Sequence, residues 1–201
     1  HLTDDLLDVI SREPKICKYV DVPFQHISDK MLTTMNRGIT SEESHRLVEK
    51  IREKIPGVRI RSTFITGLPG EGEDEFAELM DFVRWARFDR VGAFVYSPEE
   101  GTPAFTMPQQ VQKSVKKKRL DRLMRAQQEI SKELNEGMIG SRMEILVEGY
   151  DEQKKLYVGR SEFDAPDVDG VTYIRSENDL SIGDFVYVEI VGADEYDLIG
   201  E

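Results

Sequence analysis

Apolar and polar positions in the first half of the chain follow two alternating periods. Residues 16–24 (ICKYVDVPF) form a nearly continuous apolar run, residues 58–66 (VRIRSTFIT) alternate with a period of two, and residues 91–96 (VGAFVY) are again mainly apolar. A period of two or a short apolar run is typical of a strand, whereas apolar residues three and four positions apart predict a helix. We therefore expect three strands, near residues 19–24, 59–66 and 91–96.

Helical patterns separate these strands. Thr40 and Glu43 have the spacing of a capping box and precede one apolar helical face, and Ser28 is a candidate cap for the helix before it. Another helical pattern follows the turn-rich loop at residues 67–72 (GLPGEG). Strands that alternate with helices of this length indicate βαβ units and a parallel sheet. Because three strands cannot close an eight-stranded barrel, we expect a partial, open α/β barrel with helices on one face.

The second half changes character twice. A long basic helix is expected from Gln109 to about Glu136, and five short strand patterns follow Ser141. Short strands separated by Gly and Asp turns predict a small antiparallel β-barrel of the OB type. The predicted organisation is therefore a partial barrel over residues 1–108, a connecting helix over residues 109–140 and a β-barrel over residues 141–201.

Charge distinguishes the last part from the rest. The chain of 201 residues carries a net charge of −12. The first 140 residues contain 22 basic and 23 acidic side chains, whereas the last 61 contain 5 and 16. A strongly acidic barrel repels phosphate backbones and attracts basic surfaces, although acidity can also serve solubility alone.

Composition excludes several classes of protein. No apolar run approaches the roughly 20 residues that span a bilayer, and no signal-peptide pattern opens the chain. One cysteine, Cys17, excludes an internal disulfide framework and a cysteine metal cluster. We expect a cytoplasmic protein with no metal ligands of its own. Because the chain begins without Met and inside a helical pattern, we also expect a fragment of a longer protein.

Polar residues at the predicted strand ends are candidates for a ligand site, because ligands of parallel α/β folds bind there. Gln25 offers donors and acceptors after the first strand, and Tyr96 and Ser97 follow the third. Arg59 and Arg61 share one strand face, where a buried guanidinium needs an anionic partner. For each residue the sequence also leaves open a structural role, as a cap, a turn or a partner in an internal salt bridge.

Taken together and in order, these motifs resemble the radical S-adenosylmethionine (SAM) methylthiotransferases. The matching stretches are DVPFQHISDKMLTTMNRG, RIRSTFITGLPGEGEDEF and FDRVGAFVYSPEEGTPA, and the terminal barrel resembles the TRAM domain of that family. The stretches QHIS, RSTFI and SPEEG look like the RimO type, which modifies an aspartate on a small-subunit ribosomal protein. A second branch of the family modifies an adenosine beside the tRNA anticodon and stays open as an alternative.

The resemblance implies an enzyme with two [4Fe–4S] clusters, whose cysteine ligands lie in parts of the family pattern that are not in this chain. One cluster would cleave SAM to a 5′-deoxyadenosyl radical that takes a hydrogen atom from the aspartate β-carbon, and the other would deliver a methylated sulfur. We accordingly expect this chain by itself to be inactive, with no catalytic residue of its own. Six residues are implied to hold SAM: Gln25, Ser28, Arg61, Phe94, Tyr96 and Ser97.

The acidic barrel predicts the partner. Asp164, Asp167 and Asp169 cluster in one predicted loop and are the candidates for docking a basic ribosomal protein. Two readings from other classes compete with the enzyme: a non-catalytic nucleic-acid-binding module and a structural interaction domain. An OB-type barrel that binds RNA needs a basic groove with exposed aromatic side chains, and the net charge of this barrel argues against one.

Overall fold

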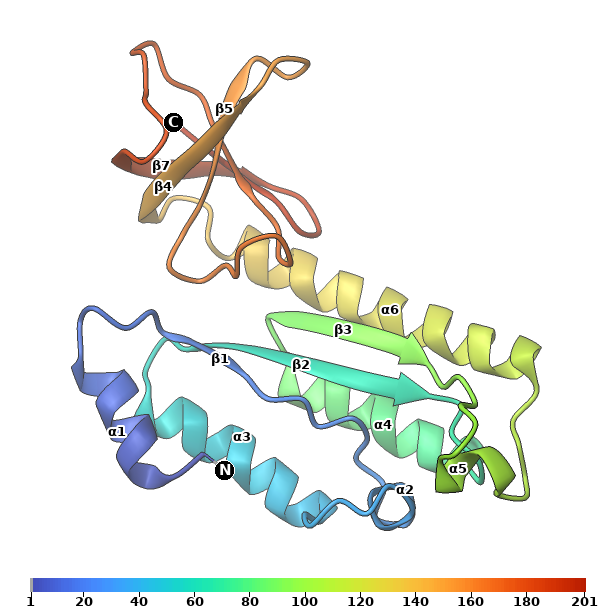
Figure 1. The fold of residues 1–201 in the computed structure, drawn as a ribbon. Coiled ribbons are helices and arrows are strands. Elements are labelled where there is room, and N and C mark those ends of the chain that lie inside the picture. Colours follow the sequence, from blue (N-terminus) through green and yellow to red (C-terminus); the bar gives the residue numbers. More distant parts are fainter. Residues whose placement is uncertain (1) are drawn as a thin grey trace.

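The computed structural model describes residues 2–201 and shows an open α/β unit joined to a closed β-barrel by one long helix (Figure 1). The helices are α1 (Asp4–Arg12), α2 (Asp29–Thr34), α3 (Ser41–Lys54), α4 (Glu73–Ala86), α5 (Pro103–Thr106) and α6 (Lys113–Glu136). The strands are β1 (Tyr19–Asp21), β2 (Arg59–Thr66), β3 (Arg90–Val95), β4 (Arg142–Asp151), β5 (Leu156–Arg160), β6 (Thr172–Ile174), β7 (Phe185–Ala193) and β8 (Leu198–Gly200).

The first three strands form a parallel sheet in the order β1-β2-β3, as the sequence predicts. β1 is shorter than the expected strand because Pro23 has no N–H group to donate to a ladder. The chain returns to the sheet at Gln25, whose N–H donates to the Thr63 carbonyl (2.8 Å) and whose carbonyl accepts from Ile65 N–H (2.9 Å). Gln25 does so with a left-handed φ of 69°.

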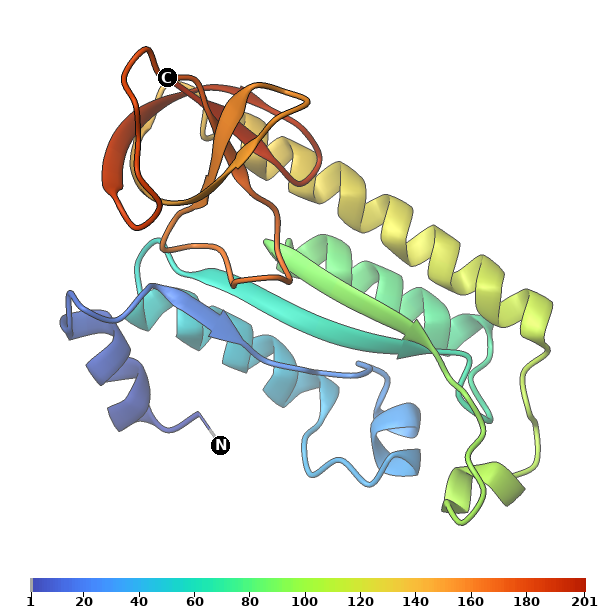
Figure 2. The same ribbon diagram turned by 45° about the horizontal axis from the view of Figure 1, so that its top comes forward.

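The two faces of the sheet differ in what covers them. Along β2 the side chains alternate between buried and half-buried, and Ile60 and Phe64 are fully buried against the helices. Phe64 packs in an aromatic cluster with Phe82 and Phe88, at ring distances of 6.3 and 5.7 Å. Figure 2 shows α3 and α4 behind this face, with α6 alongside β3. The opposite face carries no helix among the described residues.

Local signals set the helix ends. Thr40 and Glu43 form the predicted capping box, with the Thr40 hydroxyl accepting from Glu43 N–H at 3.2 Å. The long helix begins at Lys113 and not at the expected Gln109, because Gln109 has a left-handed φ of 60° that an α-helix excludes. The predicted connecting segment, residues 109–140, contains all of α6. The domain boundaries at residues 108 and 140 stay a prediction.

The last five strands close into a barrel in the order β4-β5-β6-β8-β7. Four of the neighbouring pairs are antiparallel, as expected, whereas β6 and β8 pair in parallel. A barrel without edge strands keeps its backbone groups paired, and this one has its own apolar core. That core consists of Met143, Ile145, Val147, Ile174, Val188, Ile190 and Leu198.

Candidate functional site

Arg61, Thr63 and Phe94 meet on the face of the sheet that no described helix covers. They surround Gly92, where an added Cβ would lie 3.6 Å from Thr63 Oγ1 and 3.8 Å from both Arg61 Nη2 and Phe94 Cε2. A larger residue at Gly92 would fill this concave surface. Phe94 is 61% exposed, and Arg61 Nε is buried without a hydrogen-bond partner. The surface therefore offers an exposed aromatic ring beside a guanidinium whose Nε lies 3.7 Å from the Asp21 carboxylate and whose Nη1 lies 3.6 Å from that of Asp169.

The other predicted SAM residues lie at different distances from this surface. Gln25 borders it through its backbone bonds to Thr63 and Ile65. Tyr96 follows β3, and its buried hydroxyl has no hydrogen-bond partner within the described residues. Ser28 is buried at the start of α2, where its N–H donates to His26 Nδ1 (3.1 Å), and Ser97 is exposed beyond Tyr96. The structure thus brings Arg61 and Phe94 to one face, which Gln25 borders through its backbone.

A buried polar cluster supports the strand ends from behind, and its centre is Glu71. The Glu71 carboxylate accepts from Gly67 N–H (2.7 Å) and from Arg119 Nη1 (2.8 Å). His26 Nε2 lies 3.6 Å from the same carboxylate, and both side chains are fully buried. Because His26 Nδ1 accepts a bond from Ser28, a neutral His26 carries its proton on Nε2, which faces Glu71.

Lys116 joins the same strand ends to α6. Its Nζ donates to the Tyr96 carbonyl at 2.9 Å and lies 4.6 Å from the centre of the Tyr96 ring. Its aliphatic stem occupies the space that a Cβ at Gly67 would need. Burial lowers the pKa of the Lys116 ammonium, and the nearby Glu71 opposes that shift.

Lys116, Arg119, Glu71 and His26 were not among the site residues expected from the sequence. Lys116 and Arg119 were part of a basic run that a solvated helix face explains. The available signal was the spacing of Lys116, Arg119 and Leu123, which follow one another at steps of three and four residues. This spacing places all three on one helical face, and that face is the buried stripe of α6.

The barrel contacts the sheet through polar side chains near the amino ends of the strands. The Tyr19 hydroxyl donates to Asp169 at 2.7 Å, and Arg61 Nη1 lies 3.6 Å from the same carboxylate. Burial raises the pKa of the Tyr19 phenol, and its bond to Asp169 raises this pKa further. Arg59 donates to the Asp89 carboxylate at 2.6 Å. Its anionic partner is therefore another residue of the chain, which is the structural alternative that the sequence left open.

These contacts correct the expected position of the docking acids. Asp164 is 8% exposed and pairs with Arg90 at 2.9 Å, while the Asp169 side chain is 3% exposed. Both acids therefore hold the barrel against the sheet and do not face solvent. Asp167, with a left-handed φ of 62°, is the member of the trio that lies exposed.

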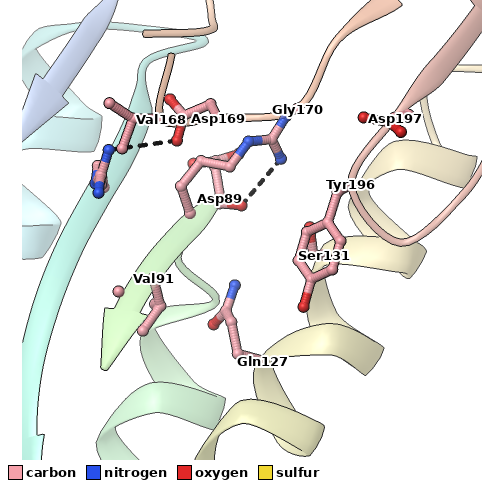
Figure 3. A pocket seen from close by; sticks show the side chains of 12 residues that line it. Asp89, Val91, Gln127, Ser131, Val168, Asp169, Gly170, Tyr196 and Asp197 are labelled. Carbon is pink, nitrogen blue, oxygen red and sulfur yellow. Dashed lines mark hydrogen bonds and ion pairs between the residues drawn. The ribbon is translucent and has the colours of Figure 1, made fainter. Parts of the chain in front are cut away.

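A cavity of about 390 Å³ lies between β3, α6 and two barrel loops. Figure 3 shows Gln127 extending from α6 toward β3 and the loop that carries Asp169 and Gly170. Four buried polar atoms on its walls make no hydrogen bond within the described residues: Arg61 Nε, Arg90 Nε, Gln127 Oε1 and Ser131 Oγ. The junction between the two units is therefore polar and suited to water or a polar ligand.

The described residues offer little for a metal. Residues 2–201 contain no group of three or more His, Cys, Asp or Glu side chains placed to hold an ion, and Cys17 is a free, exposed thiol. Within the same residues, no helix is long and apolar enough to cross a membrane.

Comparison with known proteins identifies both units. Residues 1–83 match the radical SAM superfamily, and residues 139–201 match the TRAM domain. The ribosomal protein uS12 methylthiotransferase RimO of Pelotomaculum thermopropionicum is 50% identical over 201 residues, all of this chain and 45% of the relative. RimO proteins of Caldanaerobacter subterraneus and Geobacter sulfurreducens are each 47% identical, also over 100% of the chain and 45% of their own length. The chain belongs to the radical SAM methylthiotransferase family.

Membership in this family accounts for the architecture. The sheet is a part of the radical SAM α/β unit, and the closed barrel is the TRAM domain. The chain spans about 45% of the length of the methylthiotransferases that it matches. The face with Arg61 and Phe94 is accordingly the candidate binding surface for the cofactor of the family.

Proposed function

We propose that the complete protein containing this chain transfers a methylthio group to the β-carbon of an aspartate in ribosomal protein uS12. The observation that carries the proposal is similarity along the whole chain, at 46 to 50% identity, to relatives that all bear the name uS12 methylthiotransferase. The proposed cofactors are SAM and two [4Fe–4S] clusters with ligands outside this chain. The proposed compartment is the cytoplasm.

The residues present fit a SAM molecule on the uncovered face of the sheet. Arg61 Nε makes no hydrogen bond and only a 3.7 Å ion pair with Asp21, which a ligand carboxylate would replace, while the exposed Phe94 ring suits an adenine. Gln25 and Tyr96 would supply hydrogen bonds beside them, the exposed Ser97 would complete the binding surface, and the buried Ser28 would support it from the start of α2. Bound SAM supplies radical abstraction of hydrogen from an unactivated carbon, and the chain's own part is to position the ligand and exclude water.

The Glu71 cluster would hold this surface rigid. Glu71 bonds the Gly67 loop and Arg119 of α6 and lies beside His26, which follows β1. Lys116 fixes the carbonyl of Tyr96 at the end of β3. Since a ligand that bridges strand ends needs those ends in fixed positions, these side chains would act as positioning residues.

The acidic barrel would dock a basic protein. Asp167 stays a candidate, and exposed acids on the same barrel extend the surface beyond the trio expected from sequence. Glu177 and Asp179 are exposed in the loop between β6 and β7. Exposed charges are each worth little, so the expected role is long-range steering with a steep dependence on ionic strength.

The direct test uses the complete, cluster-loaded enzyme with SAM and purified uS12. We expect uS12 to gain the mass of one methylthio group in place of one hydrogen, located on an aspartate by fragmentation mass spectrometry. Modification of tRNA adenosine with uS12 unchanged would overturn the proposal in favour of the tRNA-modifying branch. No product on either substrate would overturn both.

Two sets of variants test the assigned surfaces. Phe94→Ala should raise the KM for SAM about tenfold by loss of stacking, whereas Ile182→Ala, on the exposed surface of the barrel, should leave it unchanged. Combined reversal of Asp167, Glu177 and Asp179 to Lys should slow association with uS12 at low salt. Reversal of Asp164 or Asp169 is unsuitable for this purpose, because it would break the contact between barrel and sheet. An unchanged association rate would refute the steering role.

A further inference from the structure

The first half of α6 carries an exposed cationic surface in a chain whose net charge is −12. Residues 113–125 (KSVKKKRLDRLMR) contain seven basic side chains and one acidic side chain. Lys116 and Arg119 are buried and bonded to the strand ends, as described above. The other five basic side chains are exposed and form the α6 basic face: Lys113, Lys117, Lys118, Arg122 and Arg125.

Most of this positive charge is not neutralised within the molecule. Arg122 lies 3.6 Å from Glu73, an acid that already bonds Arg119. Lys113, Lys117, Lys118 and Arg125 have no carboxylate within 4.0 Å among the described residues. The surface is therefore available to an external anion.

The location of the first of these cations, Lys113, is unfavourable for the helix itself. The amino end of a helix is the positive end of its dipole and favours acidic residues. The helices α1, α3 and α4 follow this rule and carry acids in their first turns. α6 has none there and begins with Lys113, at an end whose cap residue Gln112 makes no side-chain bond. Because Lys113 at this end lowers helix stability, helix formation does not explain its presence.

The α6 basic face also lies beside the candidate cofactor surface. Lys116, on the same turns of the helix, bonds the carbonyl at the end of β3 and contacts Gly67 at the end of β2. Figure 1 shows the first half of α6 beside the tips of the strands, while its second half leads to the barrel. A substrate that reaches the strand ends would bring its neighbours close to this face.

We propose that the α6 basic face binds the phosphate backbone of RNA adjacent to the modified protein in its ribosomal particle. Five cations along roughly 18 Å of helix match a run of phosphates. The acidic barrel at the other end of α6 repels the same backbone, so RNA is confined to one side of the molecule. That this RNA is ribosomal rests on the proposed function, whereas the binding itself does not.

The test measures anisotropy of a short fluorescein-labelled RNA stem-loop titrated with the 201-residue chain. Four phosphate contacts predict a slope of log affinity against log salt of about −3.6, so raising salt fourfold should weaken binding about 150-fold. Reversal of Lys113, Lys117, Lys118 and Arg125 to Glu should weaken binding at least about 100-fold at low salt and flatten this slope. The helix content of that variant, by circular dichroism, should be unchanged or higher.

A matched control makes the same change in net charge elsewhere. Reversal of Arg142, Lys154, Lys155 and Arg175 to Glu alters four exposed cations of the barrel and should weaken RNA binding less than about threefold. An equal loss in both variants would overturn the proposal, since it would show a general charge effect. Competition by polyglutamate as effective as that by RNA would also overturn it and would assign the face to an acidic protein.

The complete enzyme separates this proposal from the proposed function. The α6 variant should modify free uS12 at the wild-type rate but modify uS12 in the small-subunit particle at least tenfold more slowly. Equal rates on the particle would overturn the ribosomal role of the face. A wild-type enzyme that modifies neither form would refute the proposed function and leave the measured RNA binding standing.

Discussion

The two faces of the β1-β2-β3 sheet are held by different physical forces. On one face Phe64, Phe82 and Phe88 pack with helix residues in an apolar core that excludes water. On the other, Arg61 and Tyr19 meet charged or polar partners from the barrel, and Phe94 is exposed. Stability on the first face comes from burial, which charge screening by salt does not weaken, whereas the contacts on the second are charge-assisted. The second face can therefore exchange partners without unfolding the first.

The largest test of this difference compares two phenylalanines. Phe64→Ala should destabilise the chain by about 3–5 kcal/mol, because Phe64 is fully buried and its removal leaves a cavity. Phe94→Ala should cost less than about 0.5 kcal/mol, since its ring is already exposed. Urea unfolding of both variants measures the difference. Equal losses would show that the uncovered face is a second core.

The contact between barrel and sheet should depend on single buried charges. Asp164→Ala removes the partner of Arg90 and should destabilise the chain by about 3 kcal/mol, because it leaves a guanidinium buried without its anion. Asp167→Asn is the matched control in the same loop, because Asn tolerates the left-handed φ at position 167, and it should change stability by less than about 0.5 kcal/mol. Hydrogen exchange should show faster opening of the loop around Ser161 in the first variant only. The same exchange rates in both would contradict a docking role for Asp164.

Glu71→Gln tests the polar support behind the strand ends. The amide keeps the shape of the carboxylate but removes its charge, so Arg119 loses a buried ion pair and stability should fall by about 2 kcal/mol. Glu73→Gln also removes a partner of Arg119, yet its side chain is 71% exposed, so its effect should stay below about 1 kcal/mol. Thermal unfolding of the two variants provides the measurement, and a larger effect at Glu73 would place the support at the surface.

The smallest expected effect is a dependence on alkaline pH. The pKa of the Tyr19 phenol is raised by burial and by Asp169, so the folded chain keeps this proton where the unfolded chain, with a tyrosine pKa of about 10, loses it. Stability from the protonated phenol is thus fully present below about pH 10 and declines as pH rises above it. Tyr19→Phe should remove that part of the decline in unfolding measurements. An identical pH profile in the variant would show that Tyr19 does not contribute.

Local and periodic signals were sufficient for most of the fold. The capping box of Thr40 and Glu43 was predictable because both partners lie within one turn. The alternation at residues 58–66 identified β2 and the face on which Arg61 lies. The five barrel strands followed from the same period, although the parallel pairing of β6 with β8 depends on how the whole barrel closes.

What the sequence could not reveal depends on partners distant in the chain. Asp169 pairs with Tyr19, 150 residues away, and this contact turned an expected surface acid into a buried one. Arg119 meets Glu71 across 48 residues, so its burial was invisible in a run of basic residues. Of the candidate site, Arg61 and Phe94 lie on one face of the sheet, their binding of SAM stays a prediction, and the side chains that support the strand ends were not foreseen.

The contact between Gly67 and Lys116 links the sequence choices at two distant positions. Gly67 has a left-handed φ of 78°, and the stem of Lys116 fills the space beside it. A larger residue at position 67 therefore needs a shorter one at position 116, and that exchange would also remove the ammonium from the Tyr96 carbonyl. In a library that varies both positions, a residue larger than glycine at position 67 should occur only together with a shorter residue at position 116, and chiefly as Asn or Asp, which tolerate a left-handed φ.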